Sequence, residues 1–180
     1  MQAITFRLAD SLPRTIYDRL VAEAADESDR RQRLDSIIDE GRGACILRDH
    51  AALVQAALQY FDGERYRLLA WAIMPNHVHV LVEQLDGFPL AGVVQGWKSF
   101  SAREINNRRG AKGAVWAPDY YDRYIRNGLH LTNAIAYIEN NPVKAGLVSR
   151  AEDWLFSSAT NNDAGGDARG PRKKHGKDSR

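Results

Sequence analysis

Two apolar runs separated by a turn signal constrain the fold of this chain more than any other feature. The runs Tyr66–Met74 and Val78–Glu83 are rich in branched, aromatic and alternating side chains, which favour strands. Between them lies Pro75-Asn76, a dipeptide typical of turns. We therefore predict an antiparallel β-hairpin at this point of the chain.

Further elements are predicted on both sides of the hairpin. Residues 13–40 carry apolar side chains at helical spacing, which fits one long helix or two short ones, and a second helical run, with Asp49 as its cap, ends near Phe61. The other expected elements are a strand at 3–8, an amphipathic helix at 89–108, a strand at 120–126 and a helix at 131–140 that Pro142 and Gly146 end. The predicted order is β, α, α, β, β, α, β, α.

The composition indicates one domain. A chain of 180 residues that is 44% apolar can bury a single core. It has no run of roughly 18 apolar residues, the length of a membrane span, so we expect no membrane association and a cytoplasmic location. We expect residues 1–160 to form the domain. Residues 161–180 lack apolar periodicity and should be a basic, disordered tail.

Basic residues concentrate in the second half of the chain. Residues 1–64 carry a formal charge of −4 and the remainder +6, which indicates either a polyanionic partner or ordinary surface variation. Aromatic rings interleave with the charges, and each is either a stacking platform for unpaired bases or a core residue. The residues that we expect to contact DNA are Lys98, Arg103, Arg108, Arg109, Lys112, Arg123 and Arg126, with Tyr120 and Tyr124 for stacking; Trp116 and Tyr121 lie among them.

Two histidines in the second hairpin strand are candidate metal ligands. Side chains alternate along a strand, so His77 and His79 point to the same face. Imidazole suits manganese and zinc, and magnesium is tolerated when oxygen ligands complete the shell. The only cysteine, Cys45, excludes a thiolate cluster. The alternative is that the two histidines are polar residues on a half-exposed strand.

A candidate nucleophile and a candidate third ligand lie four residues apart near a helix end. Tyr137 and Asn141 share one side of that helix, so the phenol could attack while the amide oxygen binds the metal. The alternative is that Tyr137 packs against the core and that Asn141-Pro142 only ends the helix.

Four motifs in a fixed order make the chain recognisable. They are Met74-Pro75-Asn76-His77-Val78-His79-Val80-Leu81-Val82, Trp97-Lys98-Ser99-Phe100, Asp122-Arg123-Tyr124-Ile125-Arg126, and Tyr137-Ile138-Glu139-Asn140-Asn141-Pro142-Val143-Lys144-Ala145-Gly146-Leu147-Val148. Together they resemble the REP-associated tyrosine transposases, bacterial relatives of the single-tyrosine HUH transposases of insertion sequences. The resemblance runs from about Ala3 to Ser158.

The resemblance implies an α+β fold: a ferredoxin-like antiparallel sheet with helices packed on it, the HUH endonuclease fold. It implies that His77 and His79 bind a divalent metal, Mg²⁺ or Mn²⁺, that Asn141 is the third ligand and that Tyr137 is the nucleophile. In the broader HUH group the third ligand is often glutamine or an acid, so Asn141 departs from that pattern.

The expected activity is that of a metal-dependent endonuclease and strand transferase. It would act on single-stranded DNA with palindromic or hairpin repeats through a 5′-phosphotyrosine, as a monomer that is nucleoid-associated when bound to DNA. One alternative is a catalytically silent, ferredoxin-like nucleic-acid-binding module. Another is a replication-initiator or relaxase-like nickase, against which the small size and the lack of a second tyrosine motif argue.

Overall fold

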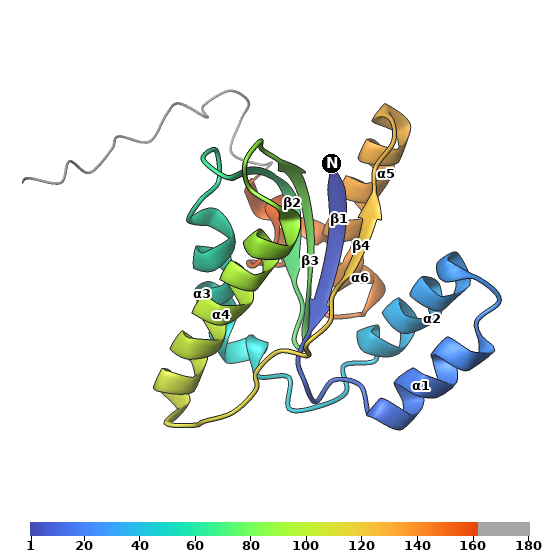
Figure 1. The fold of residues 1–180 in the computed structure, drawn as a ribbon, viewed down its shortest axis with the longest axis vertical. Coiled ribbons are helices and arrows are strands. Elements are labelled where there is room, and N and C mark those ends of the chain that lie inside the picture. The colour runs from blue at the N-terminus through green and yellow to red at the C-terminus, as the bar shows by residue number, and fades with distance from the viewer. Residues whose placement is uncertain (162–180) are drawn as a thin grey trace, which may run out of the picture.

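A four-stranded antiparallel sheet forms the centre of the computed structural model, which describes residues 1–161 apart from the side chains of Arg14, Val21, Glu27, Ser28, Arg31 and Asn161 (Figure 1). The strands are β1 (Gln2–Arg7), β2 (Tyr66–Ile73), β3 (His77–Gln84) and β4 (Tyr121–Tyr124). They lie in the order β2-β3-β1-β4, which is the ferredoxin-like order predicted. The hairpin of β2 and β3 is confirmed, and the turn at 74–76 joins its strands.

Two helices cover one face of the sheet. They are α3 (Leu47–Gln59) and α4 (Leu90–Arg109), which lie together on one side of the sheet in Figure 1. Alternate β3 residues Val78, Val80 and Val82 point into this layer and are fully buried in the main core. The connection from β1 to β2 passes through α3 on this face, and the connection from β3 to β4 passes through α4 on the same face. Because side chains alternate along a strand, the other residues of β3 must point to the opposite face.

The opposite face is covered by α5 (Gly128–Glu139), which is followed by the short helix α6 (Asn141–Lys144). Ala70 and Ala72 of β2 and Leu81 of β3 pack there with Ile125 and Ile138. The small β2 side chains leave room for α5 to lie close to the sheet. His77 and His79 belong to this face because they alternate with the buried valines.

A pair of helices beside the sheet, α1 (Arg14–Glu23) and α2 (Glu27–Asp39), stands out from the rest of the molecule in Figure 1. The residues 13–40 thus form two helices and not one. The first helix ends at Glu23 with Ala24 as its C-cap, and Asp26 begins the second, because its carboxylate accepts a hydrogen bond from the backbone N–H of Asp29 at 2.8 Å. Leu12, Leu20 and Leu34 bury this pair's own small core.

Some predicted boundaries were wrong. Asp49 was predicted as the N-cap of α3, but Ile46 holds that position and Asp49 lies inside the first turn. There its negative charge interacts favourably with the positive end of the helix dipole. The last long helix begins at Gly128, earlier than predicted, because the side chain of Asn127 accepts a hydrogen bond from the backbone N–H of His130 at 2.9 Å. The strand at 120–126 shortens to four residues.

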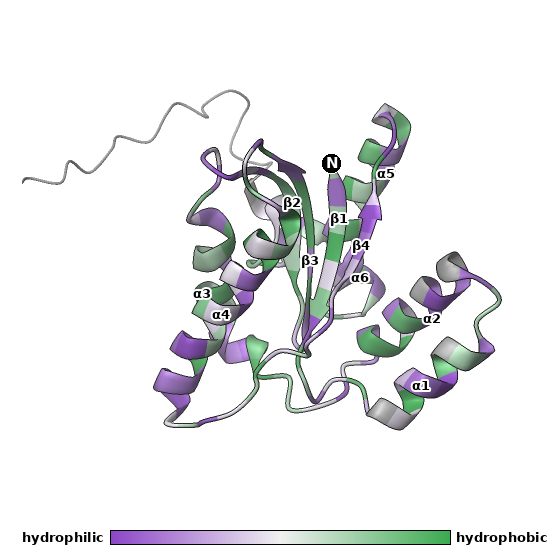
Figure 2. Cartoon of the chain, viewed as in Figure 1, coloured by the Kyte–Doolittle hydropathy of each residue, from purple (hydrophilic) through white to green (hydrophobic). Residues whose placement is uncertain are grey.

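Apolar residues gather between the sheet and its helices, and the outer helix surfaces are more hydrophilic (Figure 2). Two short 3₁₀ helices, η1 (Ala151–Asp153) and η2 (Ser158–Asn161), follow α6. Among the described residues, no helix combines the length and apolar character needed to cross a membrane. The predicted tail at 161–180 lies outside the described residues from residue 162 onward.

Candidate functional site

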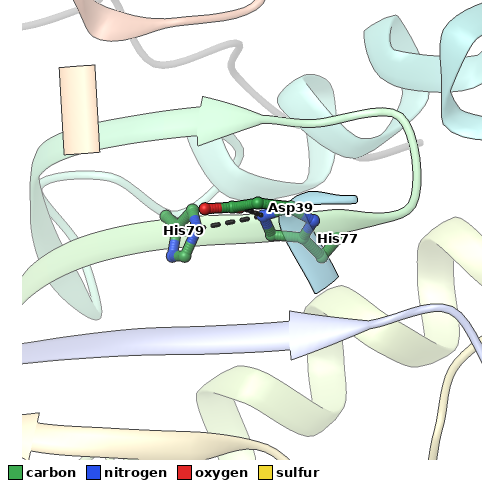
Figure 3. A group of neighbouring side chains, drawn as sticks. All are labelled: Asp39, His77 and His79. Carbon is green, nitrogen blue, oxygen red and sulfur yellow. Dashed lines mark hydrogen bonds and ion pairs between the residues drawn. The ribbon is translucent and has the colours of Figure 1, made fainter. Parts of the chain in front are cut away.

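Two buried imidazoles face each other on β3. The Nε2 atoms of His77 and His79 are 3.0 Å apart, and both rings are almost completely buried. Asp39, the last residue of α2, brings its Oδ1 to 3.3 Å from Nε2 of His77. Figure 3 shows the three side chains converging from β3 and the end of α2. Two segments that are distant in sequence thus meet at one point.

The outer ring nitrogens of both histidines are held by neighbouring side chains. The side-chain nitrogen of Asn76 donates to the carbonyl oxygens of Ile38 and Arg42, so its oxygen faces Nδ1 of His77, at 2.7 Å. That oxygen can only accept, and therefore the proton of neutral His77 lies on Nδ1 and a lone pair lies on Nε2. Thr5 Oγ1 contacts Nδ1 of His79 at 2.9 Å and orients the second ring, and this hydroxyl can either donate or accept the hydrogen bond.

The residues of this cluster fit a divalent metal. The 3.0 Å between the two Nε2 atoms is the separation expected of two ligands about 2.1 Å from one ion at a right angle. The donor atoms of Asp39, His77 and His79 all lie within 4.8 Å of one another. Both carboxylate oxygens of Asp39 and both amide atoms of Asn141 are buried without a hydrogen-bond partner. Such buried acceptors are costly unless a cation satisfies them.

The electrostatics of the cluster favour neutral, metal-ready imidazole. Burial lowers the pKa of His79 well below its ordinary value, and the nearby charges of His77 and Lys144 lower it further. His79 therefore carries a free lone pair at neutral pH. The ammonium of Lys144 lies 3.6 Å from Oδ2 of Asp39 and partly balances that carboxylate.

Tyr137 lies at the edge of the same cluster. Its ring is 6.0 Å from the ring of His79, and the side chain is 41% exposed, so the phenol is accessible from solvent. Its hydroxyl donates to Oδ2 of Asp35 at 3.2 Å. Burial raises the pKa of Tyr137 above its ordinary value, and the carboxylates of Asp35 and Asp39 raise it further. The phenol is therefore protonated at neutral pH.

A cleft of about 460 Å³ lies beside Tyr137 and His79. It lies between the sheet, α2 and α5, and its wall includes His79, Tyr137 and Lys144 together with Arg123 from β4. A cleft with two cations, a phenol and a buried metal-ligand set can bind a phosphodiester and present a nucleophile to it. Tyr137, His77 and His79, which the sequence singled out, lie in or beside this cluster, and Asn141 is a buried neighbour of Tyr137.

The basic residues predicted to contact DNA are divided between the two layers. Arg103, Arg108 and Arg109 are exposed on α4, on the opposite side of the sheet from Tyr137, and Arg103 pairs with Glu104. Arg123 lines the cleft, and Arg126 is exposed just beyond β4. The exposed residue Lys112 follows α4 and belongs with its basic surface.

Lys98, which was expected to contact DNA, does not lie on the exposed face of α4. Lys98 is 7% exposed, and its ammonium donates to the carbonyl oxygens of Ala117, Pro118 and Asp119 at 2.7, 3.0 and 3.2 Å. Burial lowers its pKa. The ammonium joins α4 to the segment that leads into β4, so Lys98 is a structural residue. By contrast, Phe100, an apolar residue of the predicted amphipathic helix at 89–108, is 41% exposed.

We predict that Lys98→Met lowers the free energy of unfolding by about 1–3 kcal/mol, because three carbonyl oxygens lose their buried donor. Urea unfolding followed by circular dichroism measures this change. The exposed counterpart Arg108→Met should alter stability by less than about 0.5 kcal/mol. Equal, small effects of the two substitutions would show that the buried ammonium contributes nothing to the fold.

The aromatic residues also divide into core and surface. Trp116 is buried and donates its indole N–H to Oγ of Ser101 at 3.0 Å. Tyr120 packs against the main core, and Tyr121 is half-buried and donates to Asp119. Only Tyr124 among these four rings, at 63%, has the exposure that a stacking platform needs. The expectation for Tyr120 as a stacking residue thus loses its support.

Comparison with known proteins identifies a family for this chain. Residues 42–141 match the model of a family described as "Transposase IS200 like". The matched segment includes both histidines of β3 and Tyr137, and it ends on Asn141. The chain belongs to the IS200-like transposase family.

Individual relatives of this IS200-like transposase are more distant. A REP-associated tyrosine transposase of Escherichia coli is 27% identical over 120 residues, which cover 65% of this chain and 68% of that protein. A relative from Haemophilus influenzae is 27% identical over 105 residues, which cover 52% of this chain and 58% of its own length. The Escherichia coli relative thus belongs to the family that the four motifs predicted for this chain.

A solved structure shows the same fold. The structure of a REP-associated tyrosine transposase bound to a REP hairpin has a TM-score of 0.62 and 20% sequence identity, and the alignment covers 99% of this chain and 90% of that one. The α+β, ferredoxin-like HUH fold predicted from the sequence is confirmed by this likeness together with the strand order.

Three residues near the site were not identified from the sequence. Asp35 and Asp39 lie on α2, outside the segment that the family model matches, in a helix so rich in charge that no acid stands out. Their spacing of four residues, which places both on one helix face, was the only available signal. Lys144 was part of the quoted Tyr137 motif, but the motif alone assigned it no partner.

Proposed function

We propose that this IS200-like transposase is a metal-dependent, single-stranded DNA endonuclease and strand transferase that acts through Tyr137. One observation carries the proposal: a solvent-accessible phenol lies beside a buried pair of facing imidazoles, in a cleft that also holds basic side chains. Cleavage by an enzyme-bound nucleophile needs these parts within one site.

The metal ligands that we propose are His77 and His79, with Asn141 and Asp39 as oxygen donors. The facing Nε2 atoms support this set, as do the buried oxygens of Asp39 and Asn141, which accept no hydrogen bond from the described residues. Mixed nitrogen and oxygen donors suit Mn²⁺ and Mg²⁺. When bound, the ion would act as a Lewis acid that stabilises negative charge on the phosphate oxygens. Thr5 and Asn76 keep both rings oriented for this role.

The proposed reaction is a displacement at phosphorus. The Tyr137 oxygen forms a bond to the phosphorus, the bond to the 3′ oxygen breaks, and the phenol proton is lost to solvent or to the departing oxygen. The products are a 5′-phosphotyrosine and a free 3′-OH. Because the phosphotyrosine conserves the phosphodiester, a 3′-OH can later attack it, release the tyrosine and join the strand without a nucleotide cofactor.

The proposed substrate is single-stranded DNA that carries hairpin-forming repeats. The likeness to a structure whose protein is bound to a REP hairpin supports this substrate. Arg123 and Lys144 at the cleft would hold phosphates beside Tyr137. The exposed arginines of α4 lie on another layer and would contact a more distant part of the DNA. We further propose a monomer that works in the cytoplasm, with residues 1–160 as its catalytic domain.

An adduct assay tests the proposal. Purified protein is mixed with Mn²⁺ and a labelled oligonucleotide containing a palindromic repeat from beside its own gene, with a single-stranded 5′ flank. We expect a protein–DNA adduct that survives denaturant, and a cut strand with a free 3′-OH. Tight hairpin binding without adduct or cleavage would refute the enzyme and leave a nucleic-acid-binding module. A blunt duplex of the same sequence is the control and should give no adduct.

A further inference from the structure

One helix face reaches both the metal-ligand cluster and the candidate nucleophile. Asp35 and Asp39 are one turn apart on α2, and their carboxylates contact Tyr137 and His77 respectively. Asp35 is the hydrogen-bond acceptor of the Tyr137 hydroxyl, across 102 positions of sequence. The α2 helix therefore supplies two acidic side chains, one to the candidate nucleophile and one to the histidine cluster.

The Asp35 contact is well supported by packing. Leu34 and Ile38, which flank Asp35 on α2, are completely buried, so the helix is held in place. The neighbouring Asn76 anchors the end of α2 by donating to the carbonyl of Ile38. The Asp35 carboxylate thus reaches Tyr137 from a fixed backbone and does not depend on a loop.

The tyrosine needs such support because its other neighbours, which include the ring of His79 at 6.0 Å and the side chain of Asn141, leave it partly exposed. Its side chain is 41% exposed, and the Lys144 ammonium lies 5.5 Å from its ring centre. An exposed phenol on a helix rotates about two side-chain bonds unless a partner selects one position. A misplacement of about 1 Å at a reacting atom can reduce a rate by about 10²-fold.

We propose that Asp35 is a positioning residue, which accepts a hydrogen bond from the Tyr137 hydroxyl and so holds the nucleophile at the cleft. This inference rests on the proposed function and deepens it. The helix that supplies Asp35 lies before residue 42, where the match to the family model begins. The positioning contact therefore comes from the α1–α2 helix pair, which lies outside the segment that matches the family model.

The test compares single-turnover adduct formation in Asp35→Ala, Asp35→Asn and the wild type. Asp35→Ala removes the acceptor, and we expect the saturating rate to fall by about 10²-fold with hairpin Kd and half-saturating DNA concentration unchanged. Asp35→Asn retains an acceptor oxygen, and we expect it to recover most of the rate. Ser36→Ala, at the exposed neighbouring position on α2, is the matched control and should react like the wild type.

The possible results separate this inference from the proposed function. If the wild type forms no adduct, the proposed function fails. If the wild type forms an adduct and Asp35→Ala reacts at the same rate, or if Asp35→Asn is as slow as Asp35→Ala, positioning by the hydrogen bond is overturned. Mn²⁺ binding by calorimetry and the melting temperature provide a second readout. Mn²⁺ binding should be unchanged in Asp35→Ala, and the melting temperature should fall by no more than about 4 °C, the shift expected from one lost hydrogen bond. Loss of Mn²⁺ binding or a larger fall in melting temperature would instead show a structural role.

Discussion

Tyr137→Phe should abolish the covalent adduct and leave hairpin binding nearly intact. The substitution removes one oxygen, the atom proposed to bond to phosphorus, and keeps the ring that lies 6.0 Å from His79. Loss of a catalytic nucleophile typically reduces rates by at least about 10⁴-fold. The substitution also removes the hydrogen bond to Asp35, which contributes about 1 kcal/mol. Even if all of that free energy were lost from DNA binding, the hairpin Kd would change by less than about tenfold. Denaturing gels and fluorescence anisotropy measure the two quantities.

Tyr124→Phe is the matched control for this prediction. Tyr124 is the most exposed of the four rings near β4 and has no contact with the histidine cluster among those described. Phenylalanine at this position keeps the ring that base stacking would use. It should retain full adduct formation. An adduct in Tyr137→Phe at the wild-type level would mean that another residue is the nucleophile.

His77→Ala or His79→Ala should remove metal binding and activity together. Each imidazole offers one Nε2 atom to the cluster, and even the loss of groups that only orient ligands reduces metal affinity by about 10- to 100-fold. We therefore expect Mn²⁺ affinity to fall by at least about 100-fold. In the wild type, Mn²⁺ at about 100 times its Kd should raise stability by about 2.7 kcal/mol, and EDTA should reverse this gain. Thermal unfolding and calorimetry measure both effects.

His130→Ala is the control for the histidine variants. His130 lines the same cleft from α5 but is outside the Asp39, His77 and His79 cluster, so its Mn²⁺ affinity should match that of the wild type. If His77→Ala still gains stability from Mn²⁺ to the wild-type extent, the cluster is not the metal site. A variant that fails to fold is recognised by its circular dichroism spectrum before metal is added.

The sequence predicted the parts of the fold and site that depend on short, regular spacing. Two histidines separated by one residue of a strand must share a face, and the structure places their Nε2 atoms 3.0 Å from each other. Tyr137 lies beside that pair, and Asn141, four residues later, is a buried neighbour of Tyr137, while the roles of both residues stay predictions. The β2–β3 hairpin followed from its turn residues and its branched side chains.

The contributions of Asp35, Asp39 and Lys98 could not be predicted because they depend on tertiary packing. The acids of α2 reach the site only because that helix packs beside the sheet, which no spacing within α2 encodes. Lys98 lies in a basic segment and was expected to face DNA. Three backbone carbonyls of a loop about 20 residues away instead surround its ammonium, and that enclosure arises only in the folded chain.

The central claim is that Tyr137 becomes covalently linked to DNA, and peptide mapping of the wild-type adduct tests it most directly. Trypsin cleavage after Arg126 and Lys144 gives a peptide of residues 127–144, whose only tyrosine is Tyr137. After nuclease digestion, mass spectrometry should find a nucleotide phosphate on this tyrosine in the presence of Mn²⁺, and none when EDTA is added. A cut strand without a linked peptide, or a phosphate on a different residue, would contradict the account.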